Sequence, residues 1–335
     1  HQAGRLLAVA RTWRTPKAPD GPHQIRDTDI PELNEVFSEA FTDRYRRDGL
    51  AGVRVPHLNP PVWRFAIADA GRGATLWRDE RGRVIAFNVA HQSGTEAWMG
   101  PLAVHPDHQG HGLGKAVVAA GVELLRTSGA KVIGLETMPR TMDNIGFYSS
   151  LGMNPGYLTL TVTRDGVFAD SLTGRANALR LGSLSADEQD RAVRECRAIT
   201  DSAITGYDFS REIQLTEELA LGDTLMLMKR GSIAGFAVCH SVPLVEGRVR
   251  EELRVLKLVV ADEEGFDFLV TLLSDHARRS GTRRVALRMQ GQYPGAYRRL
   301  MRRGARVRWS DLRMTLDGYA EPVPGEGIVL SNWEI

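Results

Sequence analysis

The chain of 335 residues has little cysteine and no long apolar run. Its two cysteines, Cys196 and Cys239, lie far apart in the sequence, so neither a disulfide framework nor a thiolate metal site is indicated. We therefore expect a protein of the reducing cytoplasm that holds no metal ion. No segment approaches the roughly 18 apolar residues that a membrane-spanning helix requires, and we expect no membrane partner.

A charge excess of either sign is also lacking, because 43 basic and 41 acidic residues leave a formal net charge of +2. This balance of bulk charge argues against a nucleic-acid partner. Only five of the basic residues are lysine, and many of the arginines gather between residues 278 and 313. We interpret this arginine-rich stretch as a solvated face, with an anionic acceptor or nucleic acid as the alternative.

The order of the elements expected along the chain occurs twice. Residues 1–22 are expected to be a flexible tail. In each copy a strand and a helix precede three strands, and short connections containing glycine predict that these three strands form an antiparallel meander. A helix, a buried strand, a second helix and a last strand follow. We predict a domain at 23–165, a linker at 166–177 and a second domain at 178–335.

This pattern predicts the α/β (α+β) fold class, with two tandem domains. Each domain is expected to have a mixed, mostly antiparallel, twisted sheet flanked by helices. At the C-terminal end, Trp333, Glu334 and Ile335 are apolar or acidic. A terminal strand that docks on a sheet is the interpretation we favour for this end. A tail that folds into a cleft is the alternative.

A glycine-rich segment lies between the strand predicted at 96–104 and the helix that follows it. Gly110, Gly112 and Gly114 occupy alternate positions there. Glycines at a helix start let a ligand approach the backbone, and the unpaired N–H groups of the first turn point toward that ligand. The helix dipole adds positive potential at the same end. The segment therefore predicts a phosphate-binding site.

A dinucleotide-binding fold is the main alternative, because Gly110, Gly112 and Glu136 imitate its fingerprint. Three features oppose it, and one of them is the polar segment His105 to Gln109 between the strand and the glycines. Lys115 stands where the fingerprint requires a third small residue, and an antiparallel meander precedes the glycines, whereas the dinucleotide-binding unit begins with the glycine-bearing strand. We favour the phosphate loop of another fold.

Two motifs resemble those of the GNAT superfamily of acyl-CoA-dependent N-acyltransferases over about residues 23–165. The first is V-x-P-x-x-[QR]-x-x-G-x-[GA], matched at Val104, Pro106, Gln109, Gly112 and Gly114. The second is N-x-x-F-Y-x-x-x-G, matched at Asn144, Phe147, Tyr148 and Gly152. The resemblance implies a GNAT-like fold in both halves, with the intact copy first.

The resemblance also implies acetyl-CoA as cosubstrate. Pantetheine and the thioester carbonyl would lie along a strand that splays open, at Leu102, Ala103 and Val104. The pyrophosphate would lie against the glycine-rich loop, at Gln109, Gly110, His111, Gly112, Leu113, Gly114 and Lys115. Asn144 and Phe147 complete the expected cofactor-binding set.

In this family an amine attacks the thioester directly in a ternary complex, and Tyr148 matches the tyrosine that donates a proton to the leaving thiolate. A tyrosine that only packs its helix onto the sheet is the alternative. Asn144 and Tyr148 are four residues apart and are expected to share one helix face. The activity implied is N-acetyl transfer to a primary amine, either a small molecule or a protein amino group.

The general base is expected at Glu96. This residue precedes Val104 by eight positions on one strand, so both side chains would point to the same face unless the strand contains a bulge. Glu136, His91, the C-terminal carboxylate of Ile335 and water remain alternatives.

The second half lacks the glycine loop. Asp262, Glu263 and Glu264 stand at the equivalent helix start, where carboxylates satisfy the helix and repel pyrophosphate. We therefore expect a degenerate copy and one CoA per chain, in a monomer or homodimer. A non-catalytic acyl-CoA-binding regulatory module is the alternative function, against which Tyr148 argues, because a sensor needs no acid near the sulfur.

Overall fold

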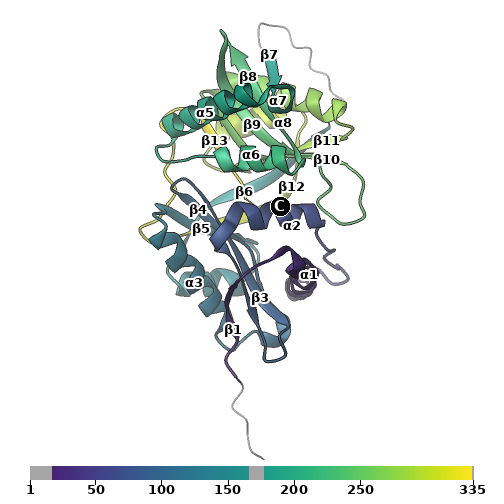
Figure 1. Ribbon diagram of the computed structural model, residues 1–335, viewed down its shortest axis with the longest axis vertical. Helices are drawn as coiled ribbons and strands as arrows, with labels where there is room; N and C mark the ends of the chain where they lie inside the picture. Colours follow the sequence, from purple (N-terminus) through teal and green to yellow (C-terminus); the bar gives the residue numbers. More distant parts are fainter. Residues whose placement is uncertain (1–16, 166–176, 334–335) are drawn as a thin grey trace, which may run out of the picture.

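The computed structural model describes residues 17–165 and 177–333. They form two lobes stacked along the long axis, with the first half of the chain below and the second half above (Figure 1). The predicted linker lies outside the described residues up to residue 176, as do residues 1–16 of the predicted tail. Within the described residues, no helix is long and apolar enough to cross a membrane.

The first half contains the helices and strands that its sequence pattern predicts, together with a second helix, α2, that the pattern did not predict. They are β1 (Asp20–Gln24), α1 (Ile30–Arg47), α2 (Pro60–Ala70), β2 (Ala74–Arg78), β3 (Val84–Ser93), β4 (Glu96–Val104), α3 (Leu113–Thr127), β5 (Val132–Thr137), α4 (Met142–Ser150) and β6 (Met153–Asp165). Strand β1 begins at Asp20, so the first strand starts inside the segment 1–22 that was expected to be a tail.

The second half repeats this order and adds one strand, β13, at its end. It contains β7 (Asn177–Arg180), α5 (Ala186–Ala203), α6 (Ser210–Glu218), β8 (Gly222–Lys229), β9 (Ser232–His240), β10 (Glu252–Val260), α7 (Glu263–Arg279), β11 (Arg284–Gln290), α8 (Pro294–Arg302), β12 (Arg306–Leu316) and β13 (Ile328–Ser331). Helix α6 was not predicted, because Ile213 and Leu215 are its only large apolar residues. It packs against α2 of the first half.

Helix α3 shows how the spacing of apolar residues produces a helix with one buried face. In α3, Leu113, Val117, Val118, Gly121 and Leu125 are buried, which is the spacing of one helix face. Gly121 allows this face to lie close to the sheet, because a Cβ there would come within 2.5 Å of the Asn88 side chain. Helix α3 therefore docks tightly on β3 and β4 and fixes where its own first turn lies.

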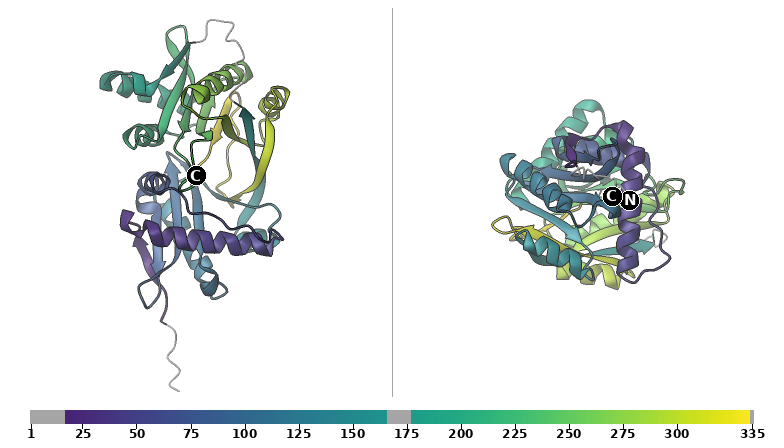
Figure 2. Two further views of the ribbon diagram at one scale, coloured as in Figure 1. Left: turned by 90° about the vertical axis from the view of Figure 1, so that its right-hand side faces the viewer. Right: turned by 90° about the horizontal axis from the view of Figure 1, so that it is seen from below.

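The thirteen strands of the described residues belong to one continuous sheet, in the order β1-β2-β3-β4-β5-β12-β6-β11-β10-β9-β8-β7, with β13 paired to β10. Strand β12 of the second half lies between β5 and β6 of the first half, and β6 in turn pairs with β11 of the second half. The last long strand of each half therefore extends into the other half. Figure 2 shows these yellow and teal strands passing between the two lobes. The α/β fold class is confirmed, whereas the exchange of strands was not predicted.

The apolar core also continues across the two halves. One cluster of buried residues combines Trp98 and Val132 of the first half with Phe209 and Trp333 of the second. The rings of Trp98 and Trp333 are stacked with their centroids 4.5 Å apart and an interplanar angle of 3°. Trp333 thus packs on the first half directly after β13, which agrees with the docked-strand interpretation. Glu334 and Ile335 lie outside the described residues.

Arg313 connects the exchanged strand to both halves. Its side chain is 1% exposed. Nε donates to Glu136 Oε1 on β5 over 3.0 Å, Nη1 pairs with Glu321, and the guanidinium lies 4.4 Å from the centroid of the Trp98 ring. Because a charge removed from water is costly unless it is paired, these contacts fix β12 against β5.

We predict that Arg313→Met lowers the free energy of unfolding by about 3–5 kcal/mol, because it leaves the Glu321 carboxylate without its partner and Glu136 with one donor fewer. Urea denaturation measures this loss. Arg306→Ala on the same strand is the control: Arg306 is exposed, so its substitution is expected to change stability by no more than about 0.5 kcal/mol. A loss below about 1 kcal/mol for Arg313→Met would show that the network does not hold the halves together.

Candidate active site

Strands β4 and β5 separate after a short parallel pairing. The pairing extends from Glu96 and Val132 to Met99 and Leu135 and then stops. Strand β4 continues to Val104 while it remains paired to β3 on its other side. From Gly100 onward, the edge of β4 that faces β5 therefore has no strand partner among the described residues. This is the splayed strand that the resemblance implied.

A bulge at Gly100 and Pro101 lies where β4 separates from β5, and it changes which face of β4 each side chain occupies. Asn88 faces Leu102 and Ala90 faces Met99, so β4 has one residue more than β3 over this interval. An extra residue reverses the alternation of side chains along a strand. The prediction that the Glu96 and Val104 side chains point to the same face is therefore wrong.

Glu96 lies between the two halves and does not line the cavity described below. It is 2% exposed, and its carboxylate accepts a hydrogen bond from Ser331 on β13. The structure thus places this predicted base in the contact between β4 and the C-terminal strand.

The glycine-rich loop leaves the first turn of α3 uncapped. Gly110 and Gly112 have φ values of 80° and 85°, which favour glycine, and the space around both is open. Gly112 is the N-cap residue, no side chain caps the helix, and its first turn contains no acidic residue. The N–H groups of this turn consequently have no partner in their own helix. Gln109 closes the loop by donating from Nε2 to the Val104 carbonyl over 2.9 Å.

Helix α4 brings the second motif to the same place. Asn144 and Tyr148 both line the cavity, which confirms that they share one helix face. Tyr148 is 8% exposed, and Asn144 donates to Thr137 Oγ1 over 3.3 Å. Phe147 lies beside Gly114, where a Cβ would be 3.4 Å from the Phe147 ring. The two motifs therefore meet through the contact between α3 and α4.

A cavity of about 490 Å³ opens beside the separated strands and lies between the two halves. Residues from α1, the β4 bulge, the end of β5 and α4 line it from the first half. The second half and β6 contribute one sheet face, on which successive strands each place at least one side chain. These are Arg254 (β10), Ala286 and Arg288 (β11), Thr161 (β6), and Trp309 and Asp311 (β12), with Glu136 (β5) completing the row.

Two carboxylates on this face share the guanidinium of Arg288 but differ in acidity. Arg288 Nη2 lies 2.9 Å from Asp311 Oδ2 and also pairs with Glu136. Burial opposes ionisation of Glu136, but Arg288, Arg313 and a hydrogen bond from Thr159 more than offset it and lower the pKa of Glu136. Burial and the neighbouring Glu136 charge raise the pKa of Asp311 to about 6 despite its contact with Arg288. Asp311 is thus the carboxylate that can exchange a proton near neutral pH.

His91 supports the bulge rather than the cavity wall. Its Nδ1 lies 2.7 Å from Asp69 Oδ2, and its Nε2 lies 2.9 Å from the Gly100 carbonyl, to which it donates. Arg211 on α6 donates from Nε to the other oxygen of Asp69 over 3.0 Å. Although burial opposes it, the hydrogen bond and charge of His91 keep the pKa of Asp69 well below its usual range. Arg211 of the second half is thus connected to the β4 bulge by the hydrogen bonds of Asp69 and His91.

The equivalent site in the second half is closed by its own chain. Strands β10 and β11 pair in parallel only from Glu252 and Arg284 to Arg254 and Ala286. Beyond this point β13 pairs with β10 at Lys257–Val260, where the corresponding edge of β4 is open. At the start of α7, Asp262 Oδ1 accepts from the Gly265 N–H over 2.7 Å. The described residues of the second half therefore have neither an open strand edge nor an uncapped helix start at this place.

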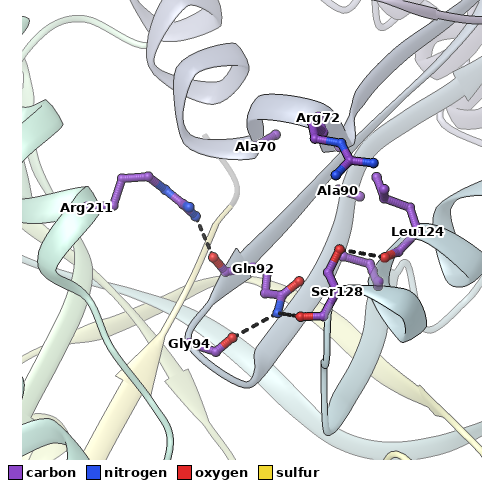
Figure 3. A pocket seen from close by; sticks show the side chains of 10 residues that line it. Ala70, Arg72, Ala90, Gln92, Gly94, Leu124, Ser128 and Arg211 are labelled. Atoms are coloured by element: carbon purple, nitrogen blue, oxygen red, sulfur yellow. Dashed lines mark hydrogen bonds between the residues drawn. The ribbon is translucent and has the colours of Figure 1, made fainter.

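A second cavity of about 270 Å³ lies where α6 meets β3 and α3 (Figure 3). The Gln92 side chain donates to the carbonyls of Gly94 and Ser128, each over 3.0 Å, and Arg211 donates to the Gln92 carbonyl. These polar groups satisfy one another and connect the two halves.

The comparisons with known proteins agree with this geometry. Residues 31–153 match the sequence profile described as Acetyltransferase (GNAT) family. These residues form a GNAT domain. Among the described residues, no group of three or more His, Cys, Asp or Glu side chains is placed to hold a metal ion.

A curated relative matches part of the GNAT domain. The chain is 32% identical over 90 residues to the [Ribosomal protein bS18]-alanine N-acetyltransferase of Escherichia coli strain K12. This alignment covers 27% of the present chain and 61% of that enzyme.

Two solved structures share the fold of both halves. A putative acetyltransferase from Pyrococcus horikoshii is 13% identical with a TM-score of 0.64, over 93% of this chain and 94% of that one. A tandem GNAT protein from the clavulanic acid biosynthesis pathway is 14% identical with a TM-score of 0.60, over 90% and 98% of the two chains. The arrangement of two GNAT-like halves is thus a known fold.

The structure brings most of the predicted site residues together around the β4 edge, the α3 start and α4. Sequence reasoning missed Arg254 and Asp311, and it included Arg288 only in the arginine-rich stretch that it interpreted as a solvated face; the second half contributes all three to the cavity. No local signal marks these residues, because each is an ordinary charged residue in a strand that pairs far along the chain.

We predict that calorimetric titration with acetyl-CoA gives one site per chain. Gly112→Asp is expected to abolish it, because a carboxylate at the uncapped start of α3 repels phosphate and fills the open space. Gly82→Asp is the matched control, since Gly82 also has a positive φ with open space around it but lies in the β2–β3 turn. Two sites in the unmodified chain, or binding retained in folded Gly112→Asp, would contradict this division between the halves.

Proposed function

We propose that the chain is an acetyl-CoA-dependent N-acetyltransferase that moves an acetyl group to a primary amine by direct attack in a ternary complex. The observation that carries this proposal is the open edge of β4. This edge lies between an uncapped helix start suited to phosphate and a cavity that contains Tyr148. The relative from Escherichia coli, an alanine N-acetyltransferase by name, supports the same reaction class.

The cosubstrate would lie along the first half. The amides at Gly110 to Lys115 would hold the pyrophosphate, and the exposed ammonium of Lys115 would add a charge-assisted contact. The open backbone of β4 at Leu102, Ala103 and Val104 would pair with pantetheine. This places the thioester beside the bulge, at the cavity end lined by Met99, Gly100 and Tyr148.

We assign Tyr148 as the general acid and Asp311 as the general base. Asp311 replaces Glu96 in this role because it lines the cavity and its pKa of about 6 lies near neutral pH. Asp311 takes a proton from the acceptor ammonium, and the amine nitrogen then attacks the carbonyl carbon. As the C–N bond forms and the C–S bond breaks, Tyr148 protonates the leaving sulfur and recovers a proton from the acceptor nitrogen.

Tyr148 distinguishes this enzyme from a non-catalytic acyl-CoA-binding module. We predict that Tyr148→Phe lowers kcat by about 10²-fold or more while the Kd for acetyl-CoA is unchanged, because only the acid is lost. Release of free thiol measures the rate. Tyr157→Phe, at an exposed tyrosine on β6, is the control and should retain full activity. An unchanged kcat in Tyr148→Phe would reduce this residue to a packing role.

Asp311 gives the reaction its expected pH dependence. Asp311 acts as a base only when ionised, so kcat/KM should fall as the pH falls through about 6. We predict that Asp311→Asn lowers kcat by about 10²-fold or more at pH 8 and removes the fall near pH 6. Asp317→Asn, at an exposed site beyond the same strand, should keep the wild-type profile. Persistence of the fall near pH 6 in Asp311→Asn would assign it to another group.

A further inference from the structure

Arg254 is a cation that the cavity wall leaves without a carboxylate partner. It lies on β10, and its Nη1 donates to the Val242 carbonyl over 2.7 Å. Among the described residues, no carboxylate oxygen lies within 4.0 Å of its guanidinium, although the side chain is half-buried and lines the cavity. Burial lowers the pKa of Arg254 to about 10, although the charge of Glu252, which lines the same cavity, opposes this shift, so the group remains charged at neutral pH.

The other two arginines of the cavity are paired. Arg288 contacts Asp311 and Glu136, and Arg44 lies 3.7 Å from Asp143 and 3.9 Å from Asp48. A buried charge is costly unless it is paired or hydrogen-bonded, and Arg254 has one hydrogen bond to a neutral group. Its unpaired N–H donors therefore suit a negative group on the molecule that enters the cavity.

We propose that Arg254 binds a carboxylate of the acceptor, so that the substrate is an elongated small amine with a carboxylate at its far end. This inference rests on the proposed function and identifies the substrate class of the same site. The second half would thereby select the acceptor as well as supply the base.

The sheet sets the approximate length of this acceptor. Strands β10 and β12 are separated by β11 and β6, so three strand spacings of about 4.8 Å place their backbones roughly 14 Å apart. Side chains from both strands shorten the gap between Arg254 and Asp311. The amine and the carboxylate should therefore be separated by several bonds, as in an ω-amino acid or a dipeptide. Phe41, Tyr45 and Trp309 also line the cavity, which suits an apolar connection.

Matched acceptor series test the proposal with the full chain and acetyl-CoA. One series pairs ω-amino acids of four to eight carbons with n-alkylamines of equal length, and the other pairs dipeptides with their C-terminal amides. We expect at least one carboxylate acceptor to exceed its uncharged counterpart in kcat/KM by about 30-fold or more. Arg254→Gln should remove this preference while the uncharged amine stays within about two-fold. Arg254→Lys should restore part of the preference, because it keeps the charge and loses the planar fork.

Arg250→Gln is the matched control, since it removes an exposed arginine just before β10 and should leave the preference intact. Titration with acetyl-CoA accompanies every variant. If acetyl-CoA binds but no carboxylate acceptor is preferred, or the preference survives in Arg254→Gln, then anion recognition by Arg254 is wrong while the proposed function stands. Preferred acetylation of a peptide amide that carries an N-terminal amine would likewise overturn anion recognition, and it would favour a protein acceptor. If acetyl-CoA does not bind, both proposals fall.

Discussion

The insertion of β12 between β5 and β6 is the constraint on which the rest of the structure depends. A strand from the end of the chain completes the sheet of the first half, and β6 completes the sheet of the second. Arg313 secures this arrangement by pairing with Glu136 across the boundary. Because these same strands line the cavity, the cavity forms only when both halves are folded together.

The two halves have the same architecture but differ at the separated strand edge and at the helix start beside it. Each has a strand that separates from its parallel neighbour, and each has a helix that begins beside the separation. In the first half both features remain open, at the β4 edge and at Gly112. In the second half β13 fills the strand edge and Asp262 caps the helix. The second half instead contributes charged side chains, among them Arg254 and Asp311, to the cavity.

Polar contacts at the β4 bulge connect these two roles. His91 donates to the Gly100 carbonyl, Asp69 accepts from His91, and Arg211 of the second half pairs with Asp69. The backbone that would face the thioester is therefore held from behind by a chain of buried groups that begins in the other half. Such support restricts the geometry of the bulge, which the proposed reaction needs for alignment of the attacking amine.

The sequence by itself determined the parts that depend on local spacing. The glycine loop at 110–114, the helix face shared by Asn144 and Tyr148, the repeated meander and the acidic start of α7 could all be predicted, because helix and strand periodicity act within a few residues. Only the tertiary structure decided the pairings between distant segments. It showed that β12 joins β5, that β13 covers β10, and that one extra residue at Gly100 and Pro101 turns Glu96 away from the cavity. Strand exchange brings Asp311 to the cavity, and the packing of the two halves brings Arg254 there, and no local pattern of residues encodes such contacts between distant segments.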